Sequence, residues 1–397
     1  MLTSLPRSDT PSKTGSGNDP LRIVLSGYYG YNNLGDEAIL AALVQQLRAL
    51  APDAELLALS GNPADTRARL GIEAVNRLDV PAIWRTLRRS DLFVSGGGSL
   101  LQDVTGLGSV PYYLGLVGLA QFLGVRTMVL GQGVGPLNLP TSRMLVGSTL
   151  RRVDAVTVRD QSSRELLARC GVPIDRVGLT ADPVLAMEPA SPERVEALRA
   201  RLGLLDGQPT IAVAIRPWHT WFERQLKAFS AVLAQHAAAW NAQILLLPFH
   251  RPDDELLAGE LRNCLETRPD AHRPHVVTLE EPVEPELMLG LISRVDLMIG
   301  MRLHALIMAA AVAVPALALV YDPKVEAFAD RAGFPSVESV TALEASNEVS
   351  SLLDRLWEHR AGLRLELQAK RDEWRALALS NAETAIALAR TAHAHHA

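Results

Sequence analysis

The sequence predicts an α/β protein with two similar domains, each built on a parallel sheet. Short apolar runs of β type alternate with longer segments of helical period along the chain, a pattern typical of parallel sheets with helices on both faces. Hydrophobic residues make up 48% of the chain but aromatic residues only 5%, which favours aliphatic layers of helix on sheet. The 397 residues suffice for two or three domains at about 100–200 residues each.

The expected strands fall into two series of apolar runs. Those of the first series are Leu21–Ser26, Leu56–Leu59, Leu92–Ser95, Thr127–Leu130 and Ala155–Val158. Those of the second series are Ile211–Ile215, Ile244–Pro248, Val276–Leu279, Leu297–Ile299 and Ala316–Val320. Segments of helical period lie between them, among them Asp36–Leu50, Ser162–Arg169, Phe222–Trp240 and Asp254–Leu265.

A proline cluster divides the two series. Three prolines fall between 183 and 192, before a fresh helix and a fresh strand, so we expect an N-terminal domain at 21–185 and a C-terminal domain at 190–345. Residues 1–20 are rich in Ser, Thr, Pro, Gly and Asp, and we expect a disordered tail there. Residues 346–397 carry no strand signal and are expected to form a C-terminal helical segment.

Charge, cysteine content and hydropathy exclude several classes of protein. A net charge of −5 argues against a general nucleic-acid binder, and two cysteines exclude a disulfide scaffold. The most apolar segment, Ala305–Val320, contains Pro315 and is shorter than the roughly 20 apolar residues of a membrane-spanning helix. We therefore expect a cytoplasmic protein; peripheral contact with a membrane-bound substrate at the inner face of the cytoplasmic membrane stays open.

Three segments share an Arg-x-Asp sequence before a short apolar run, at 89–91, 152–154 and 294–296. The runs lead into Gly96–Ser99, Arg159–Asp160 and Met301–His304. Ligands of open α/β sheets bind outside the carboxyl ends of the strands, so these three loops are expected to lie at such ends. The alternative explanation of the repeat is that strands of this kind commonly begin with a polar residue.

The loop after the first strand, 26–37, offers three tyrosines, two asparagines and two carboxylates on a glycine-rich frame. Asp36 and Glu37 would place negative charge at a helix N-terminus, where it repels phosphate. Stacking rings with amides and carboxylates suit a polyhydroxylated ligand. The alternative is a tight turn in which Asn33 or Asp36 caps the helix. Two glycine-rich loops, 96–99 and 131–136, allow close backbone approach at the same edge.

Arg302 and His304 interrupt an apolar run of strand and helix, where an unpaired buried charge costs on the order of several kcal/mol. They should therefore meet anionic partners, and a bound phosphate or carboxylate would also gain from the helix N-terminus. Lys324 follows the next strand and Arg159 a strand of the other domain. A cleft that combines these four residues would suit a small, multiply charged anion. The alternative is an internal ion pair, for instance between Arg302 and Asp322.

Other histidines and tryptophans carry weaker signals. His250 follows a strand and could line the cleft. Trp218, His219 and Trp221 could form a surface for sugar stacking, although packing in the core or in a loop is the preferred interpretation. No cluster of Cys and His has the spacing of metal ligands, so no metal site is expected.

The motifs together resemble the polysaccharide pyruvyltransferases, most closely the CsaB type. The stretches that carry the resemblance are Ser26–Glu37, Gly96–Ser99, Val158–Asp160, Gly300–His304 and Tyr321–Lys324. They occur in order within residues 21–345, across both expected domains. The resemblance implies a glycosyltransferase-B-like pair of Rossmann-like domains that face a cleft.

The resemblance also implies a reaction. Phosphoenolpyruvate is the donor, a pair of sugar hydroxyls is the acceptor, and the products are a pyruvate ketal and phosphate. In CsaB-type members the acceptor is an N-acetylmannosamine residue of a lipid-linked cell-wall glycan precursor, and S-layer homology domains bind the ketal. No cofactor or metal is required.

Site residues follow from the matching positions. The donor-binding residues implied are Arg159, Arg302, Leu303, His304 and Lys324. The acceptor side is expected to include Tyr29, Tyr31, Asn33, Asp36, Gly97 and Ser99. Some relatives carry Phe at the position of Tyr31, so the resemblance gives no role to its hydroxyl.

The chemistry of the residues fits this reaction. Arg159, Arg302 and Lys324 could neutralise the carboxylate and phosphate of phosphoenolpyruvate. His304, which titrates near neutral pH, is expected to transfer a proton, with Asp36 or Glu37 as the base toward the sugar. Two alternatives stay open: a nucleotide-sugar glycosyltransferase on the same architecture, and a non-catalytic module that binds glycans or anions.

Overall fold

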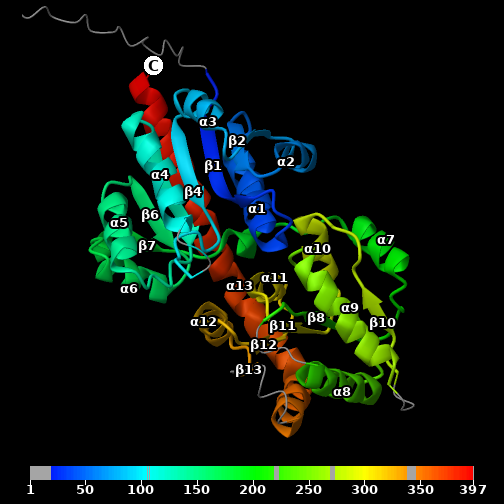
Figure 1. Ribbon diagram of the computed structural model, residues 1–397. Helices are drawn as coiled ribbons and strands as arrows, with labels where there is room; N and C mark the ends of the chain where they lie inside the picture. The colour runs from blue at the N-terminus through cyan, green and yellow to red at the C-terminus, as the bar shows by residue number, and fades with distance from the viewer. Residues whose placement is uncertain are drawn as a thin grey trace, which may run out of the picture.

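Two parallel sheets form the frame of the molecule (Figure 1). The computed structural model describes residues 19–104, 106, 108–218, 223–268, 273–337 and 346–396. The expected disordered tail therefore lies almost entirely outside the described residues, as do His219 and Trp221. The first sheet uses residues 22–179 and the second residues 210–337; the domain boundaries themselves stay a prediction.

The first sheet has seven strands in the order β3-β2-β1-β4-β5-β6-β7. They are β1 (Arg22–Tyr29), β2 (Glu55–Ser60), β3 (Glu73–Asn76), β4 (Leu92–Gly96), β5 (Arg126–Gln132), β6 (Ala155–Val158) and β7 (Val177–Leu179). The helices between them are α1 (Leu34–Leu50), α2 (Pro63–Leu70), α3 (Val80–Leu87), α4 (Ser109–Phe122), α5 (Pro140–Leu150), α6 (Gln161–Arg169) and the 3-10 turn η1 (Ile174–Arg176).

The second sheet has six strands in the order β10-β9-β8-β11-β12-β13. They are β8 (Thr210–Ala214), β9 (Gln243–Leu246), β10 (Val276–Thr278), β11 (Leu297–Gly300), β12 (Ala316–Leu319) and β13 (Ser336–Val337). Its helices are α7 (Pro192–Leu202), α8 (Glu223–Ala239), α9 (Asp253–Glu266), α10 (Pro285–Ile292), α11 (Leu303–Ala311) and α12 (Pro323–Ala332). The 3-10 turn η2 (Pro183–Ala186) lies between the two sheets in the chain.

All ten strands expected from the sequence are present, and three further strands are not among them. These are β3, β7 and β13, which have four, three and two residues and each lie at or next to a sheet edge. A run this short contains too few apolar residues to stand out from its polar neighbours.

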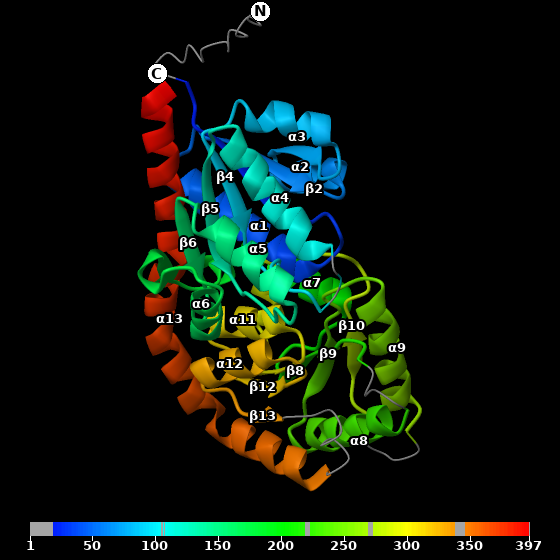
Figure 2. The same ribbon diagram turned by 60° about the vertical axis from the view of Figure 1, so that its left-hand side comes forward.

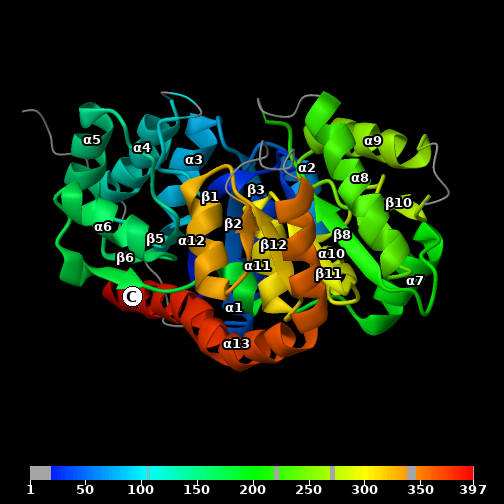
Figure 3. The ribbon, with the colours of Figure 1, turned by 90° about the horizontal axis from the view of Figure 1, so that it is seen from below.

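The C-terminal segment is one helix, α13 (Ser346–His396), that runs along both sheets (Figures 2 and 3). Near its start, Trp357 stacks on Trp240 just after α8, with ring centroids 4.3 Å apart. Farther along, the side chain of Asn381 is buried and accepts hydrogen bonds from Thr157 and Thr180 of the first domain at 2.7 and 3.0 Å. Because α13 is tied to both halves, it holds them together rather than standing apart as a separate segment.

The strand order places the ligand site. The chain reverses its direction of travel across the sheet between β1 and β4 in the first sheet and between β8 and β11 in the second. In open α/β sheets such a reversal opens a crevice outside the carboxyl ends of the strands. An apolar core joins α1, η2, α10, α11 and α13 between the two sheets, so the loops at these two crevices are held close to each other.

Candidate active site

A cleft of about 900 Å³ lies between the two sheets. The first sheet contributes Asp36, Ser99 and Arg159 to its lining, and the second contributes Arg302, His304 and Lys324. Leu303, Asn33 and His250 line it as well. The structure therefore brings most of the expected site residues together, from segments more than 250 residues apart.

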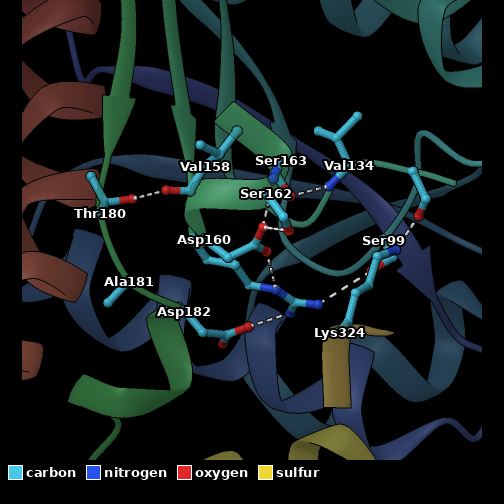
Figure 4. Close-up of polar contacts among 12 residues, drawn as sticks. Ser99, Val134, Val158, Asp160, Ser162, Ser163, Thr180, Ala181, Asp182 and Lys324 are labelled. Carbon is cyan, nitrogen blue, oxygen red and sulfur yellow. Dashed lines mark hydrogen bonds and ion pairs between the residues drawn. The ribbon is translucent and has the colours of Figure 1, made fainter. Parts of the chain in front are cut away.

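Arg159 is a buried cation at the carboxyl end of β6. Its Nη1 donates to Asp182 Oδ2 at 2.6 Å and its Nη2 to Ser99 Oγ at 3.2 Å (Figure 4). Gly133 stands beside this guanidinium, and a Cβ there would lie 2.9 Å from Nη2. The site thus fixes the orientation of Arg159 from three directions.

Asp182 joins Arg159 to His304 and was assigned no role in the sequence analysis. It is buried, and its Oδ2 also lies 3.7 Å from His304 Nε2. Its Oδ1 accepts a hydrogen bond from the Val184 amide at 3.1 Å. Burial alone would raise the pKa of Asp182, but His304 and Arg159 outweigh it and hold that pKa well below its usual range. Asp182 is therefore a carboxylate at neutral pH.

His304 lies in the first turn of α11 and points toward the start of α1. A Cβ on Gly35 would lie 2.3 Å from His304 Nδ1, so only glycine leaves room for the ring. His304 Nε2 is buried and forms no hydrogen bond with any described residue, because Asp182 Oδ2, which it faces, lies 3.7 Å away. The imidazole is thus held beside a carboxylate without a short hydrogen bond to it.

Asp36 sits on the opposite wall, in the first turn of α1. Its Oδ2 accepts a hydrogen bond from Asn33 Nδ2 at 2.6 Å, and a Cβ on Gly98 would lie 2.6 Å from its Oδ1. Burial raises the pKa of Asp36 to about 6, with a smaller increase from Glu37 that the charge of His304 opposes. A carboxylate with this pKa can accept a proton near neutral pH.

Glu37 is not available as the base toward a sugar. It is buried, its Oε2 pairs with Arg69 Nη2 at 2.7 Å, and its Oε1 accepts a hydrogen bond from the Gly30 amide at 2.7 Å. Glu37 therefore fixes the first loop, and of the two acidic candidates only Asp36 lines the cleft.

Arg302 forms an internal ion pair, as the alternative interpretation held, but with a different partner. Its Nε and Nη2 donate to the two carboxylate oxygens of Asp254 at 2.9 and 2.5 Å. Asp254 is fully buried at the start of α9, where its Oδ2 also accepts from two backbone amides. Asp322 instead caps α12 by accepting from the Lys324 amide at 2.9 Å.

Lys324 crosses the cleft from α12 to the first domain, where its Nζ donates to the Gly135 carbonyl. Burial and the positive charge of Arg159 lower the pKa of Lys324 to about 8, against the opposing charges of Asp322 and Asp160. Figure 4 shows Lys324 and Asp160 on the two sides of the site. Lys324 is thus a cation that can change charge close to physiological pH.

Two acceptor-side predictions are wrong. Tyr29 is a core residue: only 1% of it is exposed and its hydroxyl donates to the Gly96 carbonyl at 3.0 Å. Because β1 extends to Tyr29, side-chain alternation places Tyr28 on the cleft side and Tyr29 on the core side. Gly97 is also buried, with φ +67° and a Cβ position that Ile39 occupies, whereas its neighbour Gly98 lines the cleft.

The other acceptor-side residues stand at or near the cleft. Tyr31 is not in the lining; it stacks on Tyr28, which is, with ring centroids 4.5 Å apart. Asn33 caps α1 by accepting a hydrogen bond from the Gly35 amide at 3.2 Å, so the capping alternative is correct for this residue. Ser99 lines the cleft.

The structure adds two cationic groups that the sequence analysis missed. Arg77 follows the unpredicted β3 and lies 4.3 Å from the centre of the Tyr112 ring and 5.2 Å from that of Tyr113. Arg216 follows β8, where its Nη1 donates to the Tyr321 hydroxyl at 2.9 Å. Its position at the crevice of the second sheet was the signal that could have revealed it. Trp218, from the same loop, lines the cleft too.

Comparison with known proteins identifies the family. The family model described as polysaccharide pyruvyl transferase matches residues 33–323. The chain belongs to this family. The match spans most of both sheets and includes Asp36, Arg159 and His304; it ends one residue before Lys324. The suspected family is therefore confirmed, and the protein is a transferase.

Solved structures of other proteins share the fold of this transferase. Anabaena HepE in complex with UDP-glucose is 13% identical, with a TM-score of 0.61 over 94% of this chain and 99% of that one. UDP-GlcNAc 2-epimerase from Neisseria meningitidis, bound to UDP-GlcNAc, is 12% identical, with a TM-score of 0.63 over 91% and 98%. The likeness confirms the predicted glycosyltransferase-B-like pair of Rossmann-like domains.

Two features are missing from the described ranges. No helix there combines the length and apolar character needed to cross a bilayer. No three His, Cys, Asp or Glu side chains gather there as metal ligands would. The absence of a cofactor and the cytoplasmic location stay predictions.

Proposed function

We propose that this transferase moves the pyruvyl group of phosphoenolpyruvate to two hydroxyls of one sugar, forming a ketal and releasing phosphate. The observation that carries the proposal is the chain of contacts from Arg159 through Asp182 to His304. Arg159, from the first domain, is a cation that can bind an anionic donor. Through Asp182 it is linked to His304 of the second domain, whose imidazole can transfer a proton. Asp36 stands on the facing wall of the same cleft.

The donor side offers positive groups that suit a carboxylate and a phosphate. Arg159 and Lys324 are close enough for each charge to affect the other, and a dianionic ligand would relieve their repulsion. The N-terminus of α11 adds to this, because Arg302 at its first position provides no side-chain cap for the backbone amides. Uncapped amides at a helix start bind phosphate or carboxylate. The pair with Asp254 keeps Arg302 at this helix start.

The chemistry uses the two walls of the cleft. One sugar hydroxyl adds to C2 of phosphoenolpyruvate and loses its proton to Asp36, while His304 in its protonated form gives a proton to C3. Phosphate then leaves C2 with its bonding electrons, and the second hydroxyl adds to C2 and loses its proton. The donor CH2 becomes a methyl group, and the cations stabilise the departing phosphate. Lys324 is a second candidate proton donor.

The acceptor we propose is N-acetylmannosamine, or a related sugar, of a cell-wall polysaccharide or its lipid-linked precursor. Tyr28, Tyr112 and Trp218 line the cleft, and aromatic rings of this kind stack on the apolar faces of sugars. The ketal adds a carboxylate to the glycan. We propose that an S-layer homology domain binds this charge and that the reaction takes place in the cytoplasm.

The experiment is to incubate the protein with phosphoenolpyruvate and a panel of N-acetylhexosamine acceptors, measuring phosphate release and product mass. We expect phosphate release that requires an acceptor, and a product heavier by one pyruvate ketal. The variant His304→Ala should lose turnover, whereas His250→Ala, which alters another imidazole of the same cleft, should retain it. Full turnover by His304→Ala would refute the role of His304.

The same assay with other donors distinguishes the competing functions. HepE is described in complex with UDP-glucose, so UDP-glucose and UDP-GlcNAc are tested as donors beside phosphoenolpyruvate. Sugar transfer from either, without use of phosphoenolpyruvate, would establish a nucleotide-sugar glycosyltransferase instead. Binding of glycan with no turnover of any donor would establish a non-catalytic module.

A further inference from the structure

A second large cavity lies at the opposite end of the first sheet, far from the cleft. Its volume is about 860 Å³, and it opens between α3 and the amino ends of β1, β2 and β3. We call it the arginine cavity, because its rim carries Arg22, Arg48, Arg67, Arg85 and Arg89. Figures 1 and 2 place α3 at the end of the molecule that is farthest from the second sheet.

The charge of the arginine cavity is strongly positive although the whole chain carries −5. Two acidic residues, Glu55 and Glu73, stand among the five arginines, and Glu55 is already paired with Arg22 at 2.7 Å. Arg85 and Arg89 are exposed, and neither guanidinium forms a hydrogen bond or ion pair with any described residue. These two guanidiniums are free to bind an anion.

The floor of the cavity is apolar. Val24 of β1, Leu57 of β2 and Val75 of β3 lie on the side of α3, and Ile23 and Leu56 line the cavity from the other face of the sheet. Ile83 and Leu87 of α3 pack on the first of these faces, and the cavity opens beside them. A positive rim over an apolar floor matches an amphiphile: phosphate binds at the rim and the hydrocarbon lies below.

An apolar side chain projects into solvent at the same end of the molecule. Phe122, at the end of α4 that lies away from the cleft, is 77% exposed. Phe122 contacts Trp84 of α3, with ring centroids 6.2 Å apart. Exposed aromatic and aliphatic side chains beside arginines are typical of surfaces that lie in a membrane interface. A site for a soluble anion would not need them.

We propose that this end of the protein docks onto a bilayer that contains anionic phospholipid. The arginine cavity binds a lipid headgroup phosphate, while Phe122 enters the interface. The helix α4 links this surface to the cleft, because Ser109 at its start lines the cleft and Phe122 ends it. Fourteen residues at about 1.5 Å each span roughly 21 Å, a distance that a lipid-linked glycan can bridge.

Vesicle co-sedimentation tests this proposal without any activity measurement. The full chain should sediment with phosphatidylcholine vesicles that contain phosphatidylglycerol and stay in solution with phosphatidylcholine alone. The double variant R85Q/R89Q should bind roughly thirty-fold more weakly, since each arginine near the surface contributes about 1 kcal/mol, or about fivefold in affinity. The control R355Q/R371Q, which changes two exposed arginines of α13, should bind as the unaltered protein does.

Two matched substitutions test the apolar part of the surface. F122S should weaken vesicle binding, whereas L256S, on α9 and 70% exposed against 77% for Phe122, should not. Circular dichroism and thermal melting confirm that each variant is folded. Equal binding to both vesicle types, or unchanged binding by R85Q/R89Q, would overturn the proposal. So would protection by glycerol phosphate in solution without any vesicle binding, since it would mark a soluble-anion site.

Discussion

Arginine stands in opposite electrostatic settings at the two ends of the first sheet. At the carboxyl end, Arg159 is buried and held by Asp182 and Ser99. At the amino end, Arg85 and Arg89 are exposed and their guanidiniums meet no partner within the described part of the chain. The same residue type thus serves two purposes on one sheet.

The difference teaches what each end can do. A buried, paired guanidinium costs desolvation but gains a fixed geometry, which is what a reaction needs. An exposed, unpaired guanidinium gains little binding free energy from a single contact. Several of them attract an anionic surface together, and salt screens that attraction. Substitutions at the carboxyl end should therefore have large effects on rate, and substitutions at the amino end should have modest effects on binding.

The largest expected effect comes from His304. Replacing it by alanine removes the proposed proton donor, and turnover should fall by roughly 10²–10⁴-fold. Steady-state phosphate release with acceptor present measures it. A loss confined to KM, with kcat unchanged, would show that His304 only binds the donor.

Asp182→Asn tests the link between the domains. Turnover should fall by roughly 10²-fold, because neither Arg159 nor His304 keeps its carboxylate neighbour, and removing one partner of a buried pair destabilises the fold by about 3–5 kcal/mol. The pKa of Asp182 is lowered in the folded state, so its stabilising contribution is present above the unfolded pKa of about 3.9 and is lost at lower pH.

Thermal melting over pH gives the check on Asp182. The difference in stability between the unaltered protein and the Asp182→Asn variant should be full at pH 7 and should shrink as the pH falls below about 4. The same difference at pH 3 and pH 7 would contradict an ionised, paired Asp182. A variant that melts normally but has lost turnover would assign Asp182 a purely positioning role.

The pH profile gives the next effect in size. Asp36 must be ionised to accept a proton, and its pKa is about 6; Lys324 must be charged to hold phosphate, and its pKa is about 8. We expect kcat/KM to rise about tenfold per unit up to pH 6 and to fall above pH 8. In Lys324→Arg the alkaline limb should move upward, and an unmoved limb would assign it to another group.

Salt should have the smallest effect of these tests. It should weaken vesicle binding at the amino end of the first sheet and hardly change turnover at the carboxyl end. Raising NaCl from about 0.05 to 0.5 M shortens the Debye length severalfold, so vesicle binding through the arginine cavity should weaken by roughly tenfold. Turnover of a soluble acceptor should change less than about twofold over this range. Comparable losses in both assays would show that the two ends do not differ as described.

The sequence alone predicted the fold well because its signals are local. Ten strands were visible as apolar runs, and the glycosyltransferase-B-like architecture followed from their alternation and from the motifs. The three missed strands had consequences for the site: without β3, Arg77 had no expected location, and without β7, Asp182 was only a residue before a proline. Short edge strands owe their existence to tertiary pairing, which no single run encodes.

The contacts of the site residues were harder to predict from the sequence than the residues themselves. Arg302 was expected to pair with an anion, but Asp254 begins a helix 48 residues earlier and nothing in its neighbourhood marks it as the partner. Tyr29 was placed in the acceptor site by the family resemblance, in a loop expected to begin after Ser26. The observed strand β1 continues to Tyr29, which puts that side chain in the core and Tyr28 in the cleft lining.

The most direct test of the proposed transfer is the reaction run in D2O with phosphoenolpyruvate and an accepted sugar, with the product examined by mass and NMR. The proposed proton transfer to C3 predicts one phosphate released per ketal and one deuterium in each ketal methyl group. A ketal methyl without deuterium, or transfer that proceeds from a nucleotide sugar instead, would contradict the proposal.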